Sequence, residues 1–458
     1  MKAKVTFLLL FALGLNLAVG QQDPECMANL SLFHESVKIK EYDKAYEPWM
    51  ATRNKCPKLN NAIYIDGEKI LKHKIKNSSG AEKTAHVNDL LKLYDESLTH
   101  MGKKFKKGTT LAKKAQVKYE NKLGTNYDVY QEFDNAYKTD AASFRNPRRL
   151  YFYFETLYKS YKGNEGGATI EQLFDKYEDL KEKFAGETKK LSLSLDRILK
   201  KEEAGQPLTK KDQKTKKRAE TNGKAFSLFE TNMDKLIETE AKCEVLIPMY
   251  TKNFDANKSN GTWLKRAAGR MVAKECTADP LFVQIVEAYH ALEPSAESAY
   301  YLGVLSLDKK DYANAKKYFD ESAQLHTDAY KKASVYMKIA QMEKRRGAKS
   351  SARSFANKAI AQRPSYGSAY LLIASLYASS ANDCGSDVFE KKAVYWAAAK
   401  MANRAGQVDP SAKSRAAKSA ASYNAKAPSK TDIFNKGAAG KTIQIGCWIN
   451  TSVKVPNI

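Results

Sequence analysis

The stretch ASVYMKIAQMEKRRGAKSSARSFANKAIAQRP, residues 333–364, decides the fold of this chain. Its first half places apolar residues three or four positions apart, as one face of a helix requires. Gly347 then interrupts the pattern, a second helical segment follows, and Pro364 ends it. The apolar positions of the two segments are Tyr336, Ile339, Ala340, Ala352, Phe355 and Ala359. The stretch therefore predicts two antiparallel helices joined by a short turn.

The pattern that begins at Tyr336 recurs as Tyr370, Ile373 and Ala374, at an offset of 34 residues. This offset is the period of tetratricopeptide repeats, and the chain resembles that family from Ala296 to Pro410. An upstream copy of the pattern contains Leu302, Gly303, Asp311, Tyr312, Ala315 and Phe319. Its small residues let two helices approach closely, and the large ones fill the space beside them. An N-terminal copy contains Leu32, Tyr42, Ala45, Trp49 and Pro57.

We expect an all-α fold, a tetratricopeptide-like solenoid of helical hairpins with a short C-terminal β-hairpin. The expected segments are a signal peptide at 1–20, tetratricopeptide-like helical hairpins at 21–100, a Tyr- and Lys-rich helical region at 101–280 with an exposed basic loop near 201–218, repeats at 281–425 with an insertion at 379–390, and a tail with the β-hairpin at 426–458. The start of the middle region, from Met101 to Lys118, is interpreted as a basic connector.

The resemblance implies a concave groove lined by the first helix of each repeat. Carrying the family pattern over residue by residue gives the groove candidates Tyr300, Val304, Met337, Gln341, Lys344, Arg345, Leu371 and Ser375. Lys344 and Arg345 are suited to an acidic segment or a C-terminal carboxylate of a partner. The alternative is that these positions form an ordinary solvated face.

The N-terminus predicts export. Lys2 and Lys4 precede an apolar run from Val5 to Val19, and small residues follow, as in a secretory signal peptide. Export makes nucleic acid an improbable target, so the net charge of +25 favours anionic lipid, anionic glycan or an acidic protein face. For most lysines, solvation of helix surfaces is the simpler explanation.

Export permits disulfide bonds between the six cysteines. Cys26 and Cys56 would lie at the adjoining ends of an antiparallel helix pair, so we expect them to be bonded. Cys243 and Cys276 bracket another helical turn, which leaves Cys384 in the insertion for Cys447 in the tail. That last bond would fasten the expected β-hairpin, whose alternating residues run from Ile443 to Val455.

Three segments together resemble a subgroup of exported tetratricopeptide proteins from the envelope of Bacteroidota. They are the cysteine-bearing insertion, the helix AVYWAAAKMANRA at 393–405 and the tail GKTIQIGCWINTSVKVP at 440–456. The resemblance implies a location in the periplasm, with association with the outer membrane as an option.

No segment predicts catalysis, and we expect neither a cofactor nor a metal ion. The sequence GAAGKT at 437–442 lacks the first glycine of a phosphate-binding loop and precedes a strand instead of a helix. The cysteines show no CxxC pair, and the histidines show no ligand spacing. The leading hypothesis is a non-catalytic scaffold or adaptor for protein partners such as outer-membrane assembly components. The alternative is a basic binder of anionic glycan or lipid, through lysines at 103–118 and 210–217.

Overall fold

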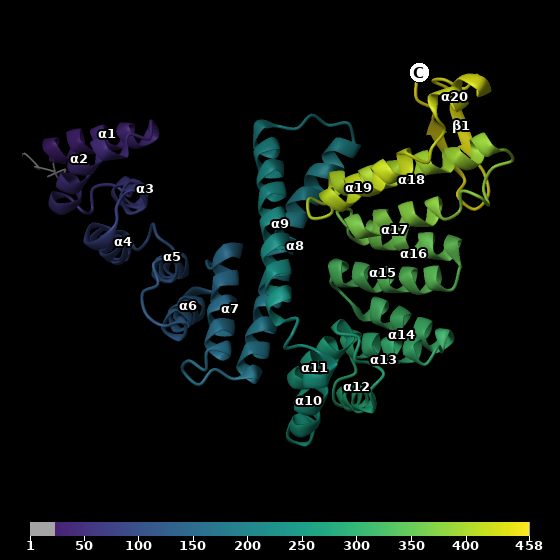
Figure 1. Ribbon diagram of the computed structural model, residues 1–458, viewed down its shortest axis with the longest axis horizontal. Helices are drawn as coiled ribbons and strands as arrows, with labels where there is room; N and C mark the ends of the chain where they lie inside the picture. Colours follow the sequence, from purple (N-terminus) through teal and green to yellow (C-terminus); the bar gives the residue numbers. More distant parts are fainter. Residues whose placement is uncertain (1–22, 458) are drawn as a thin grey trace, which may run out of the picture. The chain divides into compact units, whose positions relative to one another are not determined.

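The computed structural model describes residues 23–457 (Figure 1). The expected signal peptide at 1–20 therefore lies outside the described residues. The chain forms two compact units that divide between Arg145 and Asn146, inside the segment 101–280 that the sequence analysis treats as one region. No helix within residues 23–457 combines the length and the apolar character that crossing a bilayer requires.

The first unit is a succession of helices. They are α1 (Pro24–Lys38), α2 (Tyr42–Lys55), α3 (Ala62–Asn77), α4 (Gly80–Met101), α5 (Lys107–Glu120) and α6 (Asn126–Asp140). Trp49 is the centre of its core, and its indole N–H donates to the carbonyl of Ile63 at 2.7 Å. A Cβ on Gly67 would lie 2.6 Å from the Trp49 ring, so only glycine lets α3 approach α2 there. The predicted hairpin of the first two helices is confirmed.

The predicted connector from Met101 to Lys118 is wrong over most of its length. Helix α5 begins at Lys107, and only the short turn before it is non-helical. Lysine is a good helix former, and Ala112 and Ala115 are fully buried in this helix. The lysines therefore occupy the outer face of a helix and do not mark a loop.

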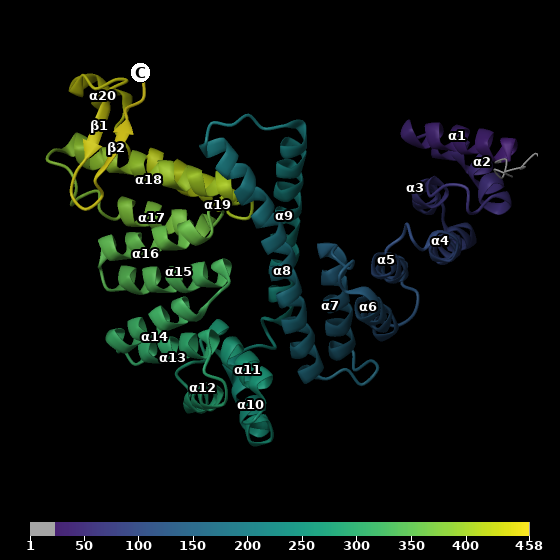
Figure 2. The same cartoon turned by 180° about the vertical axis from the view of Figure 1, so that it is seen from behind.

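The second unit contains the remaining helices and the only strands of the described chain. The helices are α7 (Pro147–Lys162), α8 (Ile170–Glu203), α9 (Lys210–Ile237), α10 (Cys243–Asn257), α11 (Gly261–Ala273), α12 (Pro280–Leu292), α13 (Ala296–Asp308), α14 (Tyr312–Leu325), α15 (Ala329–Arg345), α16 (Lys349–Gln362), α17 (Gly367–Ala378), α18 (Val388–Val408), α19 (Lys413–Asn424) and α20 (Lys430–Lys436). The strands are β1 (Thr442–Ile445) and β2 (Thr451–Lys454). Figures 1 and 2 show α13 to α18 stacked as successive hairpins.

Three helix pairs form the predicted repeats: α13 with α14, α15 with α16, and α17 with α18. Each pair also packs on the next one. Gly303 permits the closest approach, since a Cβ there would lie 2.6 Å from the ring of Phe319 on the facing helix. Ala340, Ala352 and Ala374 are buried, as the repeat pattern requires. The predicted helical solenoid is confirmed.

The predicted exposed loop near 201–218 is wrong except at residues 204–209. Helix α8 ends at Glu203 and α9 begins at Lys210, so these two long helices form a hairpin with a short turn. Thr209 caps α9, because its hydroxyl accepts from the N–H of Asp212 while the Asp212 carboxylate accepts from the N–H of Thr209. A lysine-rich sequence without apolar periodicity thus folds as an exposed helix.

The tail packs on the last repeat. The strands β1 and β2 pair antiparallel, with Thr442 opposite Lys454, and lie against α18 (Figure 2). A disulfide joins Cys384, in the turn between α17 and α18, to Cys447, in the turn between the strands. Beside it, the indole N–H of Trp448 donates to Ser380 at 3.2 Å. The turn at 379–387 lies within the predicted insertion at 379–390, whose last three residues belong to α18, and this turn holds the tail.

Candidate binding sites

The predicted groove residues divide into buried and exposed groups. Val304 and Met337 are only 3% and 6% exposed, so their side chains are unavailable to a partner. The repeat register fixes their place on α13 and α15, but neighbouring helices cover those positions. Tyr300 is also covered in part, since its ring packs on Phe319 at 5.5 Å and burial raises its pKa to about 12. Leu371 packs against a core shared with α8 and α18.

The exposed group lies on the C-terminal half of α15. It consists of Gln341, Lys344 and Arg345. The Lys344 ammonium donates to the hydroxyl of Ser375 at 2.9 Å, which connects α15 to α17 across the repeat boundary. Burial and the neighbouring charge of Arg345 lower the pKa of Lys338 on the same helix. We call Gln341, Lys344 and Arg345 the α15 surface.

The hairpin of α8 and α9 runs along one edge of the repeats, where successive repeats connect (Figures 1 and 2). Lys189 on α8 pairs with Asp328 at 2.5 Å, immediately before α15. The Tyr330 hydroxyl donates to Asp196 on α8 at 2.6 Å. Near the tip of the hairpin, Leu195 and Leu199 join the apolar core with α17, α18 and α19. The hairpin therefore covers this edge and leaves the α15 surface open.

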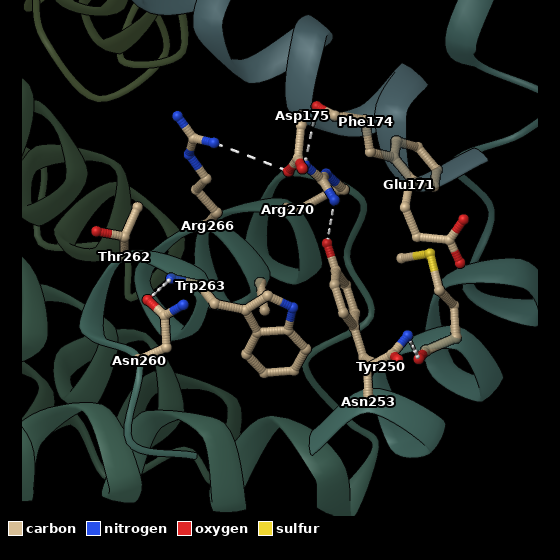
Figure 3. Close-up of a pocket in the computed structure, with 12 residues that line it drawn as sticks. Glu171, Phe174, Asp175, Tyr250, Asn253, Asn260, Thr262, Trp263, Arg266 and Arg270 are labelled. Carbon is tan, nitrogen blue, oxygen red and sulfur yellow. Dashed lines mark hydrogen bonds and ion pairs between the residues drawn. The ribbon is translucent and has the colours of Figure 1, made fainter. Parts of the chain in front are cut away.

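One end of the hairpin meets α10 and α11 at Arg270 (Figure 3). The Arg270 guanidinium donates to the hydroxyl of Tyr250, to the carbonyl of Phe174 at 3.3 Å, and to the carboxylate of Glu178 at 3.2 Å. It also lies over the Phe174 ring, 4.5 Å from the centroid. Arg270 is 6% exposed, so a single side chain links three helices in the interior. We call this cluster the arginine junction.

A cavity of about 200 Å³ adjoins the arginine junction, and Trp263 and Tyr250 form a corner of it with their rings 5.4 Å apart and nearly perpendicular (Figure 3). Both of its arginines are paired. Arg266 pairs with Asp179 at 2.6 Å, and Arg270 pairs with Glu178. Burial raises the pKa of Glu178, although the two arginines oppose that shift. The paired arginines indicate that this side of the cavity is a structural joint between helices.

Near the other end of the hairpin, a hollow of about 440 Å³ lies between α9, α18 and α19. Its charged walls are Lys216, Glu220 and Lys224 on α9 and Lys413 on α19. The remaining lining residues are polar or small: Asn403, Gly406, Gln407, Pro410, Ala416 and Ala417. We call this hollow the lysine pocket. The sequence pattern does not predict this pocket, because the lack of apolar periodicity around Lys216 indicates a loop. The four-residue spacing of Lys216, Glu220 and Lys224 on one helix face is the signal that could have revealed it.

The six cysteines form three disulfides in the structure. The bonds join Cys26 to Cys56, Cys243 to Cys276, and Cys384 to Cys447, which are the pairs that the sequence analysis favours. Within residues 23–457, the one cluster with metal-ligand geometry is Asp23, Cys26 and Cys56. Both of its sulfurs are used in the first disulfide, so this cluster is not a metal centre.

Comparison of the sequence with known proteins assigns the chain to no family. No family model matches the chain, and no curated protein matches it. Among solved structures it is similar to a tetratricopeptide repeat protein from Parabacteroides merdae, at 12% identity over 67% of this chain and 95% of that one, with a TM-score of 0.25.

Two eukaryotic structures are similar at the same level. Yeast Tom70 is 12% identical over 90% of this chain and 83% of that one, with a TM-score of 0.27. The human IFIT1 dimer with m7Gppp-AAAA is 11% identical over 88% of this chain and 91% of that one, with a TM-score of 0.28. The paired helices and the 34-residue offset within the chain itself carry the conclusion: the repeats from Ala296 to Val408 are of the tetratricopeptide type.

Proposed function

We propose that this chain is a non-catalytic repeat scaffold that binds protein partners. The observation that carries the proposal is the α15 surface, which stays exposed in the middle of the stack while the opposite edge is covered by α8 and α9. A stack of helix pairs offers a continuous, rigid binding face. Lys344 and Arg345 bring positive charge to that face, so an acidic segment or a C-terminal carboxylate of the partner fits it.

Site-specific photo-crosslinking in cells tests this proposal. A photoreactive residue at Gln341 should give a discrete cross-linked protein, and the double variant Lys344→Glu/Arg345→Glu should abolish it. The matched control is Lys103→Glu/Lys104→Glu, which makes the same change of charge on exposed lysines of the first unit. The absence of a discrete product, or its equal loss in the control, would contradict the proposal.

The scaffold is proposed to act after export, in the periplasm or at the periplasmic side of the outer membrane. The support is the set of three disulfides, since such bonds persist in oxidising compartments. Thiol labelling of denatured protein from intact cells should find the cysteines blocked until a reductant is added. Recovery of the chain with free thiols in the cytosolic fraction would refute this location.

A second candidate function is binding of an anionic glycan or lipid, and the lysine pocket favours it. Within residues 23–457, no ion pair joins Lys224 or Lys413 to a carboxylate, so both ammonium groups are available to a ligand. Attraction of this kind weakens as salt rises. Binding to an anionic surface that did not respond to salt would remove this candidate.

A further inference from the structure

The lysine pocket is a fixed part of the second unit. Arg404 on α18 pairs with Glu203 at the end of α8, and Lys216 on α9 pairs with Glu202 at 2.6 Å. A Cβ on Gly223 would lie 3.8 Å from the side chain of Pro410, which shows that α9 and the turn between α18 and α19 are in contact. The walls of the pocket therefore come from elements that are tied together, and the hollow does not depend on a mobile segment.

Small residues create the hollow. Gly406 lets α18 and α19 approach, since a Cβ there would lie 3.1 Å from the Cβ of Ala416. Ala416 and Ala417 then leave the space beyond them unfilled. The resulting volume of about 440 Å³ falls in the range of roughly 300–1,000 Å³ that is usual for small-molecule pockets.

The charges around the hollow are unequal and only partly matched. Lys216 is neutralised by Glu202, whereas Lys224 and Lys413 have no carboxylate partner among the described residues. Glu220 lies between Lys216 and Lys224 on the same face of α9 and adds one negative charge. The carboxamides of Asn403 and Gln407 supply neutral donors and acceptors. A complementary ligand needs an anionic group for the lysines and uncharged hydroxyls for the glutamate and the carboxamides.

We propose that the lysine pocket binds a carboxylate-bearing sugar, such as a uronic acid unit of an anionic glycan. The sugar carboxylate is held by Lys224 and Lys413 through charge-assisted hydrogen bonds. The ring hydroxyls donate to Glu220 and exchange hydrogen bonds with Asn403 and Gln407. This inference rests on the second candidate function and names its ligand class and its site.

Other ligand classes fit the walls less well. A phosphomonoester dianion carries more negative charge than a carboxylate and has no hydroxyl hydrogen, so Glu220 repels it more strongly and gains no hydrogen bond in exchange. A neutral sugar leaves the two lysines without a counter-charge. An anionic lipid would also need a large apolar surface for its acyl chains. The lining of the pocket is charged, polar or small and offers no such surface.

Calorimetric titration of the full chain tests the proposal. The probes are short alginate oligosaccharides, which consist of uronic acids, neutral maltooligosaccharides of the same length, tripolyphosphate, and vesicles that contain phosphatidylglycerol. We expect measurable binding of alginate oligosaccharides alone, with an affinity that falls as salt rises. Lys224→Gln/Lys413→Gln should weaken that binding by about tenfold or more, because two charge-assisted hydrogen bonds are lost.

Two further variants separate the pocket from general attraction to a basic protein. Lys76→Gln/Lys83→Gln removes the same charge from exposed lysines of the first unit that lie outside 103–118 and 210–217, and it should change the affinity by less than about twofold. Ala417→Tyr fills the hollow without a change of charge and should weaken binding as the lysine variant does. Equal effects of the two lysine pairs would overturn the pocket but leave anion binding by the surface intact.

The remaining outcomes are also decisive. Tighter binding of tripolyphosphate than of alginate would overturn the sugar assignment in favour of a simple anion site. Binding of the vesicles without binding of alginate would assign the lysines to a lipid surface. Failure of all anionic probes would remove both the pocket and the second candidate function, while the photo-crosslinking result at Gln341 would stand independently.

Discussion

The two ends of the α8–α9 hairpin handle charge in opposite ways. At the arginine junction, Arg270 is buried, and each of its three guanidinium nitrogens donates to a group on another helix. At the lysine pocket, near the tip, Lys224 and Lys413 are exposed and have no carboxylate partner in the described chain. A buried charge must be paired to be tolerated, whereas an exposed one can remain available to a ligand. The comparison separates the part of the hairpin that maintains the fold from the part that is free to bind.

The largest expected effect tests the structural end. Arg270→Met keeps most of the side-chain volume but leaves Glu178 and the Tyr250 hydroxyl without their partner. We expect the second unit to lose about 3 kcal/mol of its free energy of unfolding, since a buried pair has lost one member. Urea denaturation, with hydrogen exchange of peptides from α8, α10 and α11 to assign the transition, measures this loss.

Arg266→Met is the matched control for that prediction. Arg266 also pairs with a carboxylate of α8, but its side chain is 26% exposed. Its loss should cost no more than about 1 kcal/mol, as for other solvated ion pairs. Equal costs for the two variants would break the distinction between a buried joint and a surface contact.

Acidification should affect the two ends with opposite sign. Burial raises the pKa of Glu178, so the folded state binds this proton more tightly than the unfolded chain does. Its ionised form therefore weakens the fold at neutral pH, and the penalty is relieved as the pH falls through the raised value. Hydrogen bonds from Lys201 and Thr209 lower the pKa of Asp212 from 3.8 to about 2. Its contribution is complete above pH 3.8 and is lost as the pH falls toward 2.

Hydrogen exchange measured between pH 7 and pH 2.5, corrected for the intrinsic rate, resolves the two ends. Glu178→Gln should remove a gain in relative protection of α8 and α11 at mildly acidic pH. Asp212→Asn should remove a loss of protection at the start of α9 below pH 3.8. The same change of protection with pH in both segments would show that the hairpin responds to acid as a whole. It would contradict the proposed difference between its two ends.

The smallest expected effect tests the binding end. Lys224→Gln/Lys413→Gln should change the free energy of unfolding by no more than about 0.5 kcal/mol, because neither ammonium group has a partner to lose. Thermal denaturation followed by circular dichroism suffices as the measurement. A large loss of stability would mean that these lysines stabilise the fold, and it would contradict their proposed role in binding a ligand.

The sequence predicts the elements whose signals are local. The recurrence of Tyr336 as Tyr370 predicts the repeat period, and the places of Cys26 and Cys56 at adjoining helix ends predict their bond. The sequence does not predict the lysine-rich start of α9. This part of the helix is largely exposed, so it shows little apolar periodicity. Composition alone does not separate it from a loop.

The candidate sites depend on contacts between distant segments, and for that reason the sequence predicts them poorly. The repeat register places Val304 and Met337 on the correct helices, but it cannot show that neighbouring helices bury them. The lysine pocket combines α9 with α18 and α19, which are far apart along the chain. In the sequence, Arg270 resembles any other basic residue of an amphipathic helix. Only the structure shows that α8 and α10 surround it.

The disulfide between Cys384 and Cys447 also has a mechanical consequence. It spans 63 residues, and α18, α19, α20 and β1 lie between its two sulfurs. A force applied at the C-terminus therefore passes from β2 through the sulfur–sulfur bond directly to the turn after α17. The enclosed helices bear no tension, and the terminal repeat is shielded from a pull that would otherwise unravel a solenoid from its end.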